Sequence, residues 1–126
     1  MRLVPTLILM ALLLPLGAAD FATTGATRIV NVIDFDFVDT SSGNEFTIIH
    51  VGDRVGWYFT PAANHPHSAK SGTSITVGGV GASMFDSNVQ PAHSGQTTYY
   101  TFVTSGIWFY NCVVHTQMKG YIVVQP

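Results

Sequence analysis

The most informative stretch of this chain reads Gly106-Ile-Trp-Phe-Tyr-Asn-Cys112-Val-Val-His115-Thr-Gln-Met118-Lys-Gly120-Tyr-Ile-Val-Val124. A strand that ends at Cys112 places Trp108, Tyr110 and Cys112 on one face, since side chains alternate between the two faces of a strand. We therefore expect the thiol to point inward with the aromatic rings. The chain must then fold back before Gly120 begins the last strand, and this return can bring the histidine and the methionine of the loop round the sulfur.

Three side chains in this loop can bind a soft or borderline metal ion: Cys112, His115 and Met118. Thiolate and thioether sulfur favour Cu(I), and imidazole accepts either oxidation state of copper. Two histidines and one cysteine in a plane, with a long axial methionine, form the blue-copper arrangement. His67 is the best candidate for the second imidazole, because it lies on a loop that follows a predicted strand. We predict one copper ion bound by His67, Cys112, His115 and Met118.

Cys112 is the only cysteine of the chain, so no intrachain disulfide can form. An exported protein of this size often uses paired cysteines as staples. A single thiol in an oxidising compartment is a hazard unless it is buried or bound, and a metal–thiolate bond is one explanation. The alternative is a buried thiol that acts only as a small hydrophobic side chain.

Residues 1–19 have the pattern of a secretory signal peptide, with a charged start, an apolar run over 3–16 and Gly17-Ala18-Ala19 before the expected cut. The apolar run is shorter than the roughly twenty residues that a membrane-spanning helix needs, and a retained membrane anchor is the rival interpretation. We predict a signal peptide over 1–19, a short lead-in over 20–27 and one copper-binding domain over 28–126. The protein would then be periplasmic, otherwise extracytoplasmic, or secreted.

The rest of the sequence is typical of an all-β domain, because short apolar runs are separated by Gly, Pro, Asn, Asp and Ser. Ile33, Phe35 and Phe37 alternate with Asp34 and Asp36, which predicts a strand with one face in a core. Further strands are predicted over 45–51, 54–60, 74–77, 97–103, 106–111 and 120–124. Seven or eight strands in about a hundred residues favour a Greek-key sandwich of two sheets.

The charge of the chain argues against nucleic acid as a partner. Without residues 1–19, four basic residues face seven acidic ones, and no basic stripe is available to neutralise phosphates. Charged residues make up 10% of the chain, against about 25% in an average domain. We expect a monomer without stable membrane insertion once the signal peptide is cleaved.

Several segments together resemble the cupredoxins, the family of small blue-copper proteins that includes plastocyanin, azurin and amicyanin. These segments are 51–57 for the family's glycine turn and strand, Pro66-His67-Ser68 for its first-ligand loop, and Phe85-Asp86-Ser87 with 106–124 for its last strands. The spacing from Cys112 through His115 to Met118 is that of the amicyanin ligand loop. The resemblance covers most of the chain from about residue 28 to the end.

The resemblance implies an exported electron carrier rather than an enzyme, which cycles between Cu(II) and Cu(I) and exchanges electrons with transient protein partners. It implies that Ser68 holds the copper loop by hydrogen bonding, although a plain loop serine fits the sequence equally well. It further implies that the edge of His115 reaches the surface through an apolar patch that includes Val113 and Val114. This patch would be the docking face for the redox partners.

Three other functions stay open for such a sequence. The first is a copper carrier or buffer that delivers the metal without physiological redox cycling. The second is a metal-free sandwich for adhesion or structure, which would not need the complete set of four ligands. The third is a copper oxidase or reductase, which is disfavoured because so short a chain offers no second metal site.

The remaining histidines and aromatic residues have simpler interpretations. His65 is a rival to His67 as a metal ligand, whereas His50 and His93 are expected to face solvent and Met84 to join the core. Aromatic residues at strand spacing are what a sandwich core needs, so we expect core packing rather than an electron pathway for Trp57, Phe59, Trp108 and Tyr110.

Overall fold

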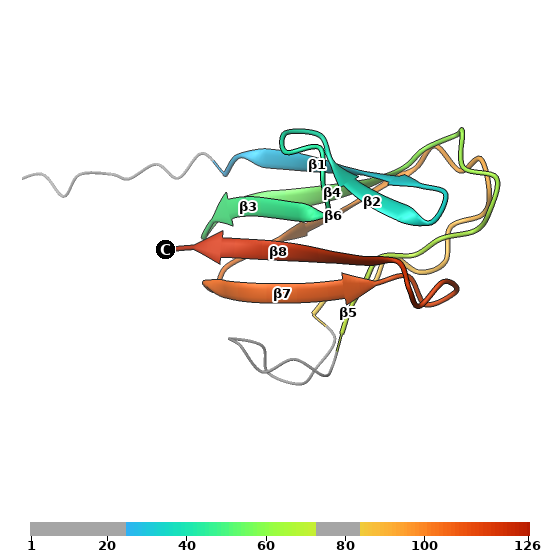
Figure 1. Cartoon of the computed structure of the whole chain (residues 1–126). Helices are drawn as coiled ribbons and strands as arrows, with labels where there is room; N and C mark the ends of the chain where they lie inside the picture. The colour runs from blue at the N-terminus through green and yellow to red at the C-terminus, as the bar shows by residue number, and fades with distance from the viewer. Residues whose placement is uncertain (1–24, 73–83) are drawn as a thin grey trace, which may run out of the picture.

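The computed structural model describes residues 25–72 and 84–126, which form two four-stranded sheets packed face to face (Figure 1). The strand order is β2-β1-β4-β6 in one sheet and β3-β8-β7-β5 in the other. The strands of the described part are β1 (Thr27–Ile33), β2 (Asp36–Asp39), β3 (Phe46–His50), β4 (Arg54–Phe59), β5 (Lys70–Ser71), β6 (Thr97–Thr101), β7 (Gly106–Asn111) and β8 (Lys119–Gln125). The predicted all-β sandwich is confirmed.

Four of the predicted strands agree with the structure to within a few residues, namely β3, β4, β6 and β8, and β7 agrees at both ends. The predicted signal peptide over 1–19, most of the lead-in over 20–27 and the predicted strand over 74–77 lie outside the described residues. Within the described ranges, no helix has the length and hydropathy needed to cross a membrane.

The chain passes from one sheet to the other at successive connections between β2 and β7. Each sheet also contains a parallel pair, β1 with β4 in the first and β3 with β8 in the second. Because parallel strands end at the same edge of a sheet, the turn after β1 and the loop after β4 lie at one end of the sandwich. The loop between β7 and β8 lies at the same end, opposite the C-terminus (Figure 1).

The core lies between the sheets and is formed by alternate residues of the long strands. Val30, Val32, Val55, Phe37, Phe102 and Ile122 are each at most 1% exposed. Trp57 stacks on Phe85 at 4.5 Å, and Phe37 of the first sheet meets Tyr110 of the second at 4.7 Å, both measured between ring centroids. Burial of one such ring stabilises the fold by about 1.5–3 kcal/mol. The predicted core positions Trp57, Phe59, Trp108 and Tyr110 are all buried, as expected.

The prediction of one strand through Ile33, Phe35 and Phe37 is wrong. Asp34 and Phe35 form a tight turn, after which Asp36 pairs back with Ile33. Phe35 has a φ of 65° and is 56% exposed, whereas Phe37 is fully buried. The sequence pattern did not reveal this turn, because two short strands joined by two residues show the same alternation as one longer strand. The turn also lacks the glycine or asparagine that usually marks a two-residue turn.

Candidate metal centre

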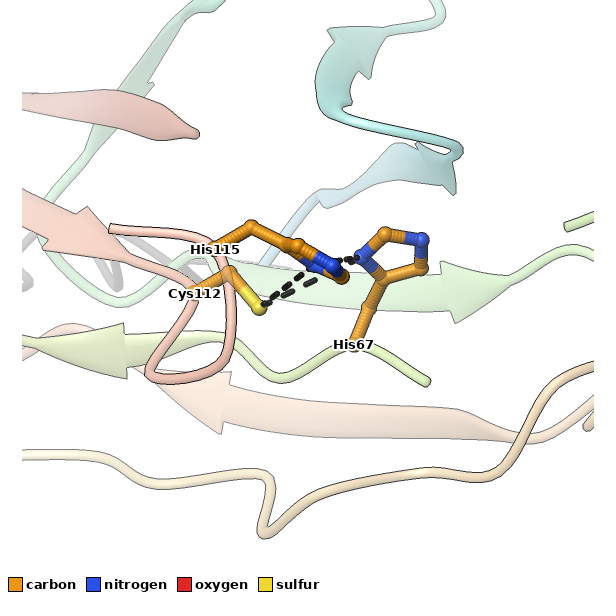
Figure 2. Close-up of side chains that lie close together, drawn as sticks. All are labelled: His67, Cys112 and His115. Carbon is orange, nitrogen blue, oxygen red and sulfur yellow. Dashed lines mark hydrogen bonds between the residues drawn. The ribbon is translucent and has the colours of Figure 1, made fainter. Parts of the chain in front are cut away.

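Three side chains that sequence analysis singled out, His67, Cys112 and His115, meet at the end of the sandwich where the loop between β7 and β8 lies (Figure 2). Cys112 Sγ lies 4.0 Å from His67 Nδ1 and 3.8 Å from His115 Nδ1, and the two Nδ1 atoms are 3.2 Å apart. Cys112 and His67 are 0% and 2% exposed, and His115 is half-buried. One sulfur and two imidazole nitrogens therefore face a common, largely desolvated point.

Cys112 continues the inward face of β7, on which Trp108 and Tyr110 are also buried, as the alternation predicted. Two backbone hydrogen bonds then close the loop. Cys112 N–H donates to the carbonyl oxygen of Met118 at 3.1 Å, and Met118 N–H donates to that of His115 at 2.9 Å. Met118 is 3% exposed, so the predicted axial ligand is buried in the same short loop.

His67 reaches the site from the loop between β4 and β5. Its backbone pairs with Gln90 through two hydrogen bonds, from His67 N–H at 3.1 Å and from Gln90 N–H at 2.8 Å. Its rival His65 lies to one side, with Nδ1 3.2 Å from an oxygen of Asp34 and the side chain 49% exposed. Of the two histidines beside Pro66, only His67 directs a ring nitrogen at Cys112 in the described structure.

Ser68 connects the loops that carry His67 and Cys112. Its backbone N–H donates to Cys112 Sγ at 3.3 Å, and its hydroxyl oxygen accepts a bond from Val113 N–H at 3.0 Å. Ser68 is fully buried. The Ser68 amide therefore holds the sulfur in place from the loop that carries His67.

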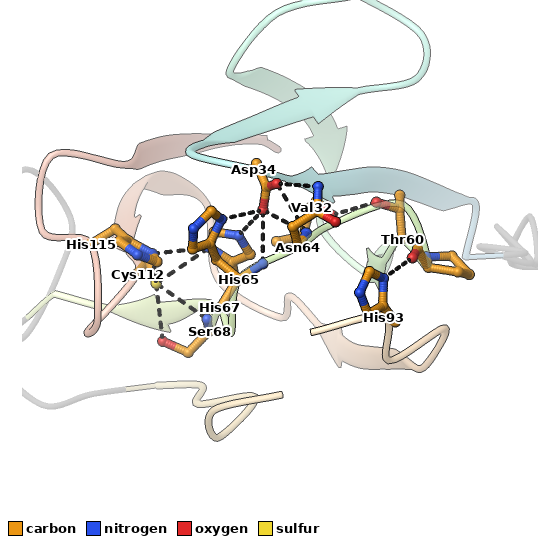
Figure 3. A network of polar contacts seen from close by, with 11 residues as sticks. Val32, Asp34, Thr60, Asn64, His65, His67, Ser68, His93, Cys112 and His115 are labelled. Carbon is orange, nitrogen blue, oxygen red and sulfur yellow. Dashed lines mark hydrogen bonds and ion pairs between the residues drawn. The ribbon is translucent and has the colours of Figure 1, made fainter. Parts of the chain in front are cut away.

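Asp34 is a part of the site that sequence analysis missed. Its carboxylate accepts hydrogen bonds from the backbone N–H groups of Asn64 and His65, at 2.9 and 3.1 Å, and faces Nε2 of His67 at 3.0 Å (Figure 3). The amide of Asn64 and then the ring of His67 hold the pKa of Asp34 well below its usual value. The carboxylate is therefore ionised, whereas the sequence suggested only a solvent-facing position on a strand.

The electrostatics of the site favour neutral imidazole at His115. Desolvation is the largest cause that lowers the pKa of this ring, followed by repulsion from His67 and His65, while Asp34 acts in the opposite direction. A neutral ring keeps a lone pair on Nδ1 for a metal. One thiol sulfur and two imidazole nitrogens, with a thioether in the same loop, suit copper better than a structural zinc site, which usually has more thiolates.

Exposed apolar residues lie next to His115 in the chain or against its ring, and we call Phe35, Val113 and Val114 the apolar rim. Val113 and Val114 are each 46% exposed, and the ring of Phe35 lies 4.9 Å from that of His115 in an edge-on arrangement. The sequence assigned Phe35 to the core, whereas the structure places it at the surface beside His115. His50 and His93 are exposed and Met84 packs against the core, as expected.

Comparison with solved structures identifies the fold. The reduced state of an amicyanin mutant matches with a TM-score of 0.61 at 20% identity, covering 85% of this chain and 88% of that chain. An amicyanin mutant with Cu(I) matches with a TM-score of 0.62 at 19% identity, covering 79% and 83%. An oxidised mutant gives 0.61 at 20%, covering 85% and 88%. This chain has the amicyanin fold.

The resemblance to the cupredoxins that the sequence suggested is therefore confirmed in three dimensions. No family model and no curated protein sequence matches the chain. At about one identical residue in five, the likeness to amicyanin concerns the fold. The case for a function rests on the cluster of His67, Cys112 and His115 at the end of this β-sandwich.

Proposed function

We propose that this protein is an exported electron carrier that holds one copper ion through His67, Cys112, His115 and Met118. One observation carries the proposal: a buried thiol and two imidazole nitrogens lie within 4.8 Å of one another, on a fold shared with amicyanin. When bound, copper supplies a one-electron couple between Cu(II) and Cu(I). No catalytic step is assigned to the chain, which we propose is not an enzyme.

The proposed ligands are held by a frame that limits their movement. His67 is fixed by its backbone pair with Gln90, and the loop from Cys112 to Met118 is closed by its own hydrogen bonds. Ser68 joins the two loops through Cys112 Sγ and Val113 N–H. A rigid frame suits electron transfer, because little reorganisation of the protein accompanies the change of charge.

The partner would dock on the apolar rim formed by Phe35, Val113 and Val114 around the edge of His115. An apolar and uncharged rim supports brief association with a redox partner, since such encounters bury small areas. We include Phe35 with the two valines because its ring lies against that of His115.

Replacing the thiol tests the proposed centre directly. The copper-loaded wild-type protein is expected to have an intense visible absorption from thiolate-to-copper charge transfer, and Cys112→Ala is expected to lose it, because no other sulfur anion exists in the chain. Visible and electron spin resonance spectra after copper titration measure this. His50→Ala, at an exposed position, is the control and keeps the band. A Cys112→Ala protein that stays intensely coloured contradicts the proposal.

A copper-delivery role would give the opposite kinetics from an electron carrier. Electron exchange that is fast compared with copper loss to a chelator supports the carrier. Rapid copper loss together with slow electron exchange supports delivery.

A further inference from the structure

The carboxylate of Asp34 accepts several hydrogen bonds from the loop between β4 and β5. The donors are the backbone N–H groups of Asn64 and His65, the side-chain amide of Asn64, and the rings of His65 and His67. The side chain of Asp34 is 24% exposed and that of His67 is 1% exposed. The carboxylate thus anchors the first-ligand loop from the turn between β1 and β2, which belongs to another part of the chain (Figure 3).

The contact with Asp34 determines which nitrogen of His67 carries the proton. A carboxylate can only accept, so the ring nitrogen at 3.0 Å, Nε2, must be the N–H donor. In the neutral ring the other nitrogen, Nδ1, then has a lone pair, and Nδ1 is the atom that faces Cys112 Sγ and His115 Nδ1. Without the carboxylate, a proton on His67 Nδ1 would find an acceptor in His115 Nδ1 only 3.2 Å away. That alternative tautomer would block the metal-binding atom.

The charge of Asp34 also acts on the site. A carboxylate that is hydrogen-bonded to a ligand ring raises the basicity of that ring and stabilises positive charge on its far side. The oxidised centre carries one more positive charge than the reduced centre. The anion therefore stabilises the oxidised state more strongly.

We propose that Asp34 is a positioning residue for the metal centre: it selects the His67 tautomer that leaves Nδ1 free, and its charge lowers the reduction potential. The second half of this statement rests on the proposed function. The first half concerns the metal-free protein and holds independently of it.

The tautomer is measured without metal. Long-range proton–nitrogen NMR spectra of the metal-free protein, recorded at pH 8, distinguish a protonated ring nitrogen from one with a lone pair. Wild type is expected to show His67 protonated at Nε2. Asp34→Ala is expected to show a mixture of both tautomers, and Asp34→Asn, whose amide oxygen can still accept, is expected to resemble wild type. An Asp34→Ala spectrum with His67 still wholly protonated at Nε2 overturns the tautomer role.

The charge is measured in the copper-loaded protein. Asp34→Asn keeps an acceptor for Nε2 but removes the anion, so its reduction potential is expected to rise above that of wild type. Asp86→Asn is the matched control, because this substitution removes the same charge. Asp86 pairs with Lys70 at the surface, at 3.2 Å. Asp34→Ala is also expected to bind copper about 10–100-fold more weakly, as is usual when such a partner of a ligand is lost.

The outcomes separate this inference from the proposed function. A potential for Asp34→Asn that does not rise, or rises no more than that of Asp86→Asn, overturns the charge role while the copper centre stands. A wild-type protein that never develops the thiolate absorption removes the proposed function, and the metal-free spectra still decide the tautomer. Circular dichroism of both Asp34 variants checks that the sandwich is intact.

Discussion

Cys112 is the residue on which the chemistry of the site depends, and its surroundings are unusually specific for a free thiol. It is fully buried, accepts a hydrogen bond from Ser68 N–H, and lies within 4.0 Å of two imidazole nitrogens. A thiol that served only as a small hydrophobic side chain would have apolar neighbours. The two polar neighbours, His67 and His115, support the proposed ligand role over core filling.

A substitution at Met118 tests whether its thioether acts as the proposed axial ligand. Met118→Leu keeps the volume of this buried side chain but removes its sulfur. The copper-loaded variant is expected to stay coloured and to have a raised reduction potential, because a weak axial donor that favours the oxidised state is lost. Visible spectra and redox titration measure both properties. A colourless variant would contradict a purely axial role for this methionine.

At the scale of the elements, the turn between β1 and β2 brings two neighbouring residues to different environments. Asp34 faces the first-ligand loop, and Phe35 lies at the surface beside His115. Phe37, two positions further on, is already in the core against Tyr110. The turn thus supplies one polar and one apolar side chain to the end of the sandwich with the candidate metal centre, while the strand that follows contributes Phe37 to the core.

The pair of Phe35 and Phe37 tests this arrangement. Phe37→Ala is expected to reduce the free energy of unfolding by about 3–5 kcal/mol, since it leaves a cavity between the sheets. Phe35→Ala, at a position that is 56% exposed, is expected to change it by less than about 0.5 kcal/mol. Urea unfolding followed by tryptophan fluorescence measures both. Equal losses in the two variants would mean that Phe35 also packs in the core.

At the scale of the whole molecule, the sandwich separates its two ends. One end carries His115 with its apolar rim, and the other carries the C-terminus and the connection between β6 and β7 (Figure 1). Val114 and Val103 are exposed valines at these two ends, with exposed fractions of 46% and 69%. Because the two ends are far apart, a substitution at Val103 is a control for the same substitution at Val114.

A lysine at either end tests the docking face without knowledge of the natural partner. In electron self-exchange two copies of the protein meet, so a charge at the contact is repeated on both sides and repels. Val114→Lys is expected to slow self-exchange by about tenfold or more, which corresponds to roughly 1.4 kcal/mol. Val103→Lys is expected to leave the rate nearly unchanged. NMR line broadening in mixtures of the oxidised and reduced protein gives the rate, and equal slowing by both variants would place docking elsewhere.

The sequence by itself determined the β-sandwich and most strand positions, because strand alternation is a local property of the chain. The spacing from Cys112 to Met118 is local too, and it singled out the candidate ligand loop. The sequence also named His67, although only as the better of two histidines. Only the tertiary structure decided that Asp34 and Phe35 lie beside the candidate metal centre. Asp34 and His67 are 33 residues apart in the chain, and they meet because the parallel pairing of β1 with β4 brings the ends of both strands to the same edge of the sheet.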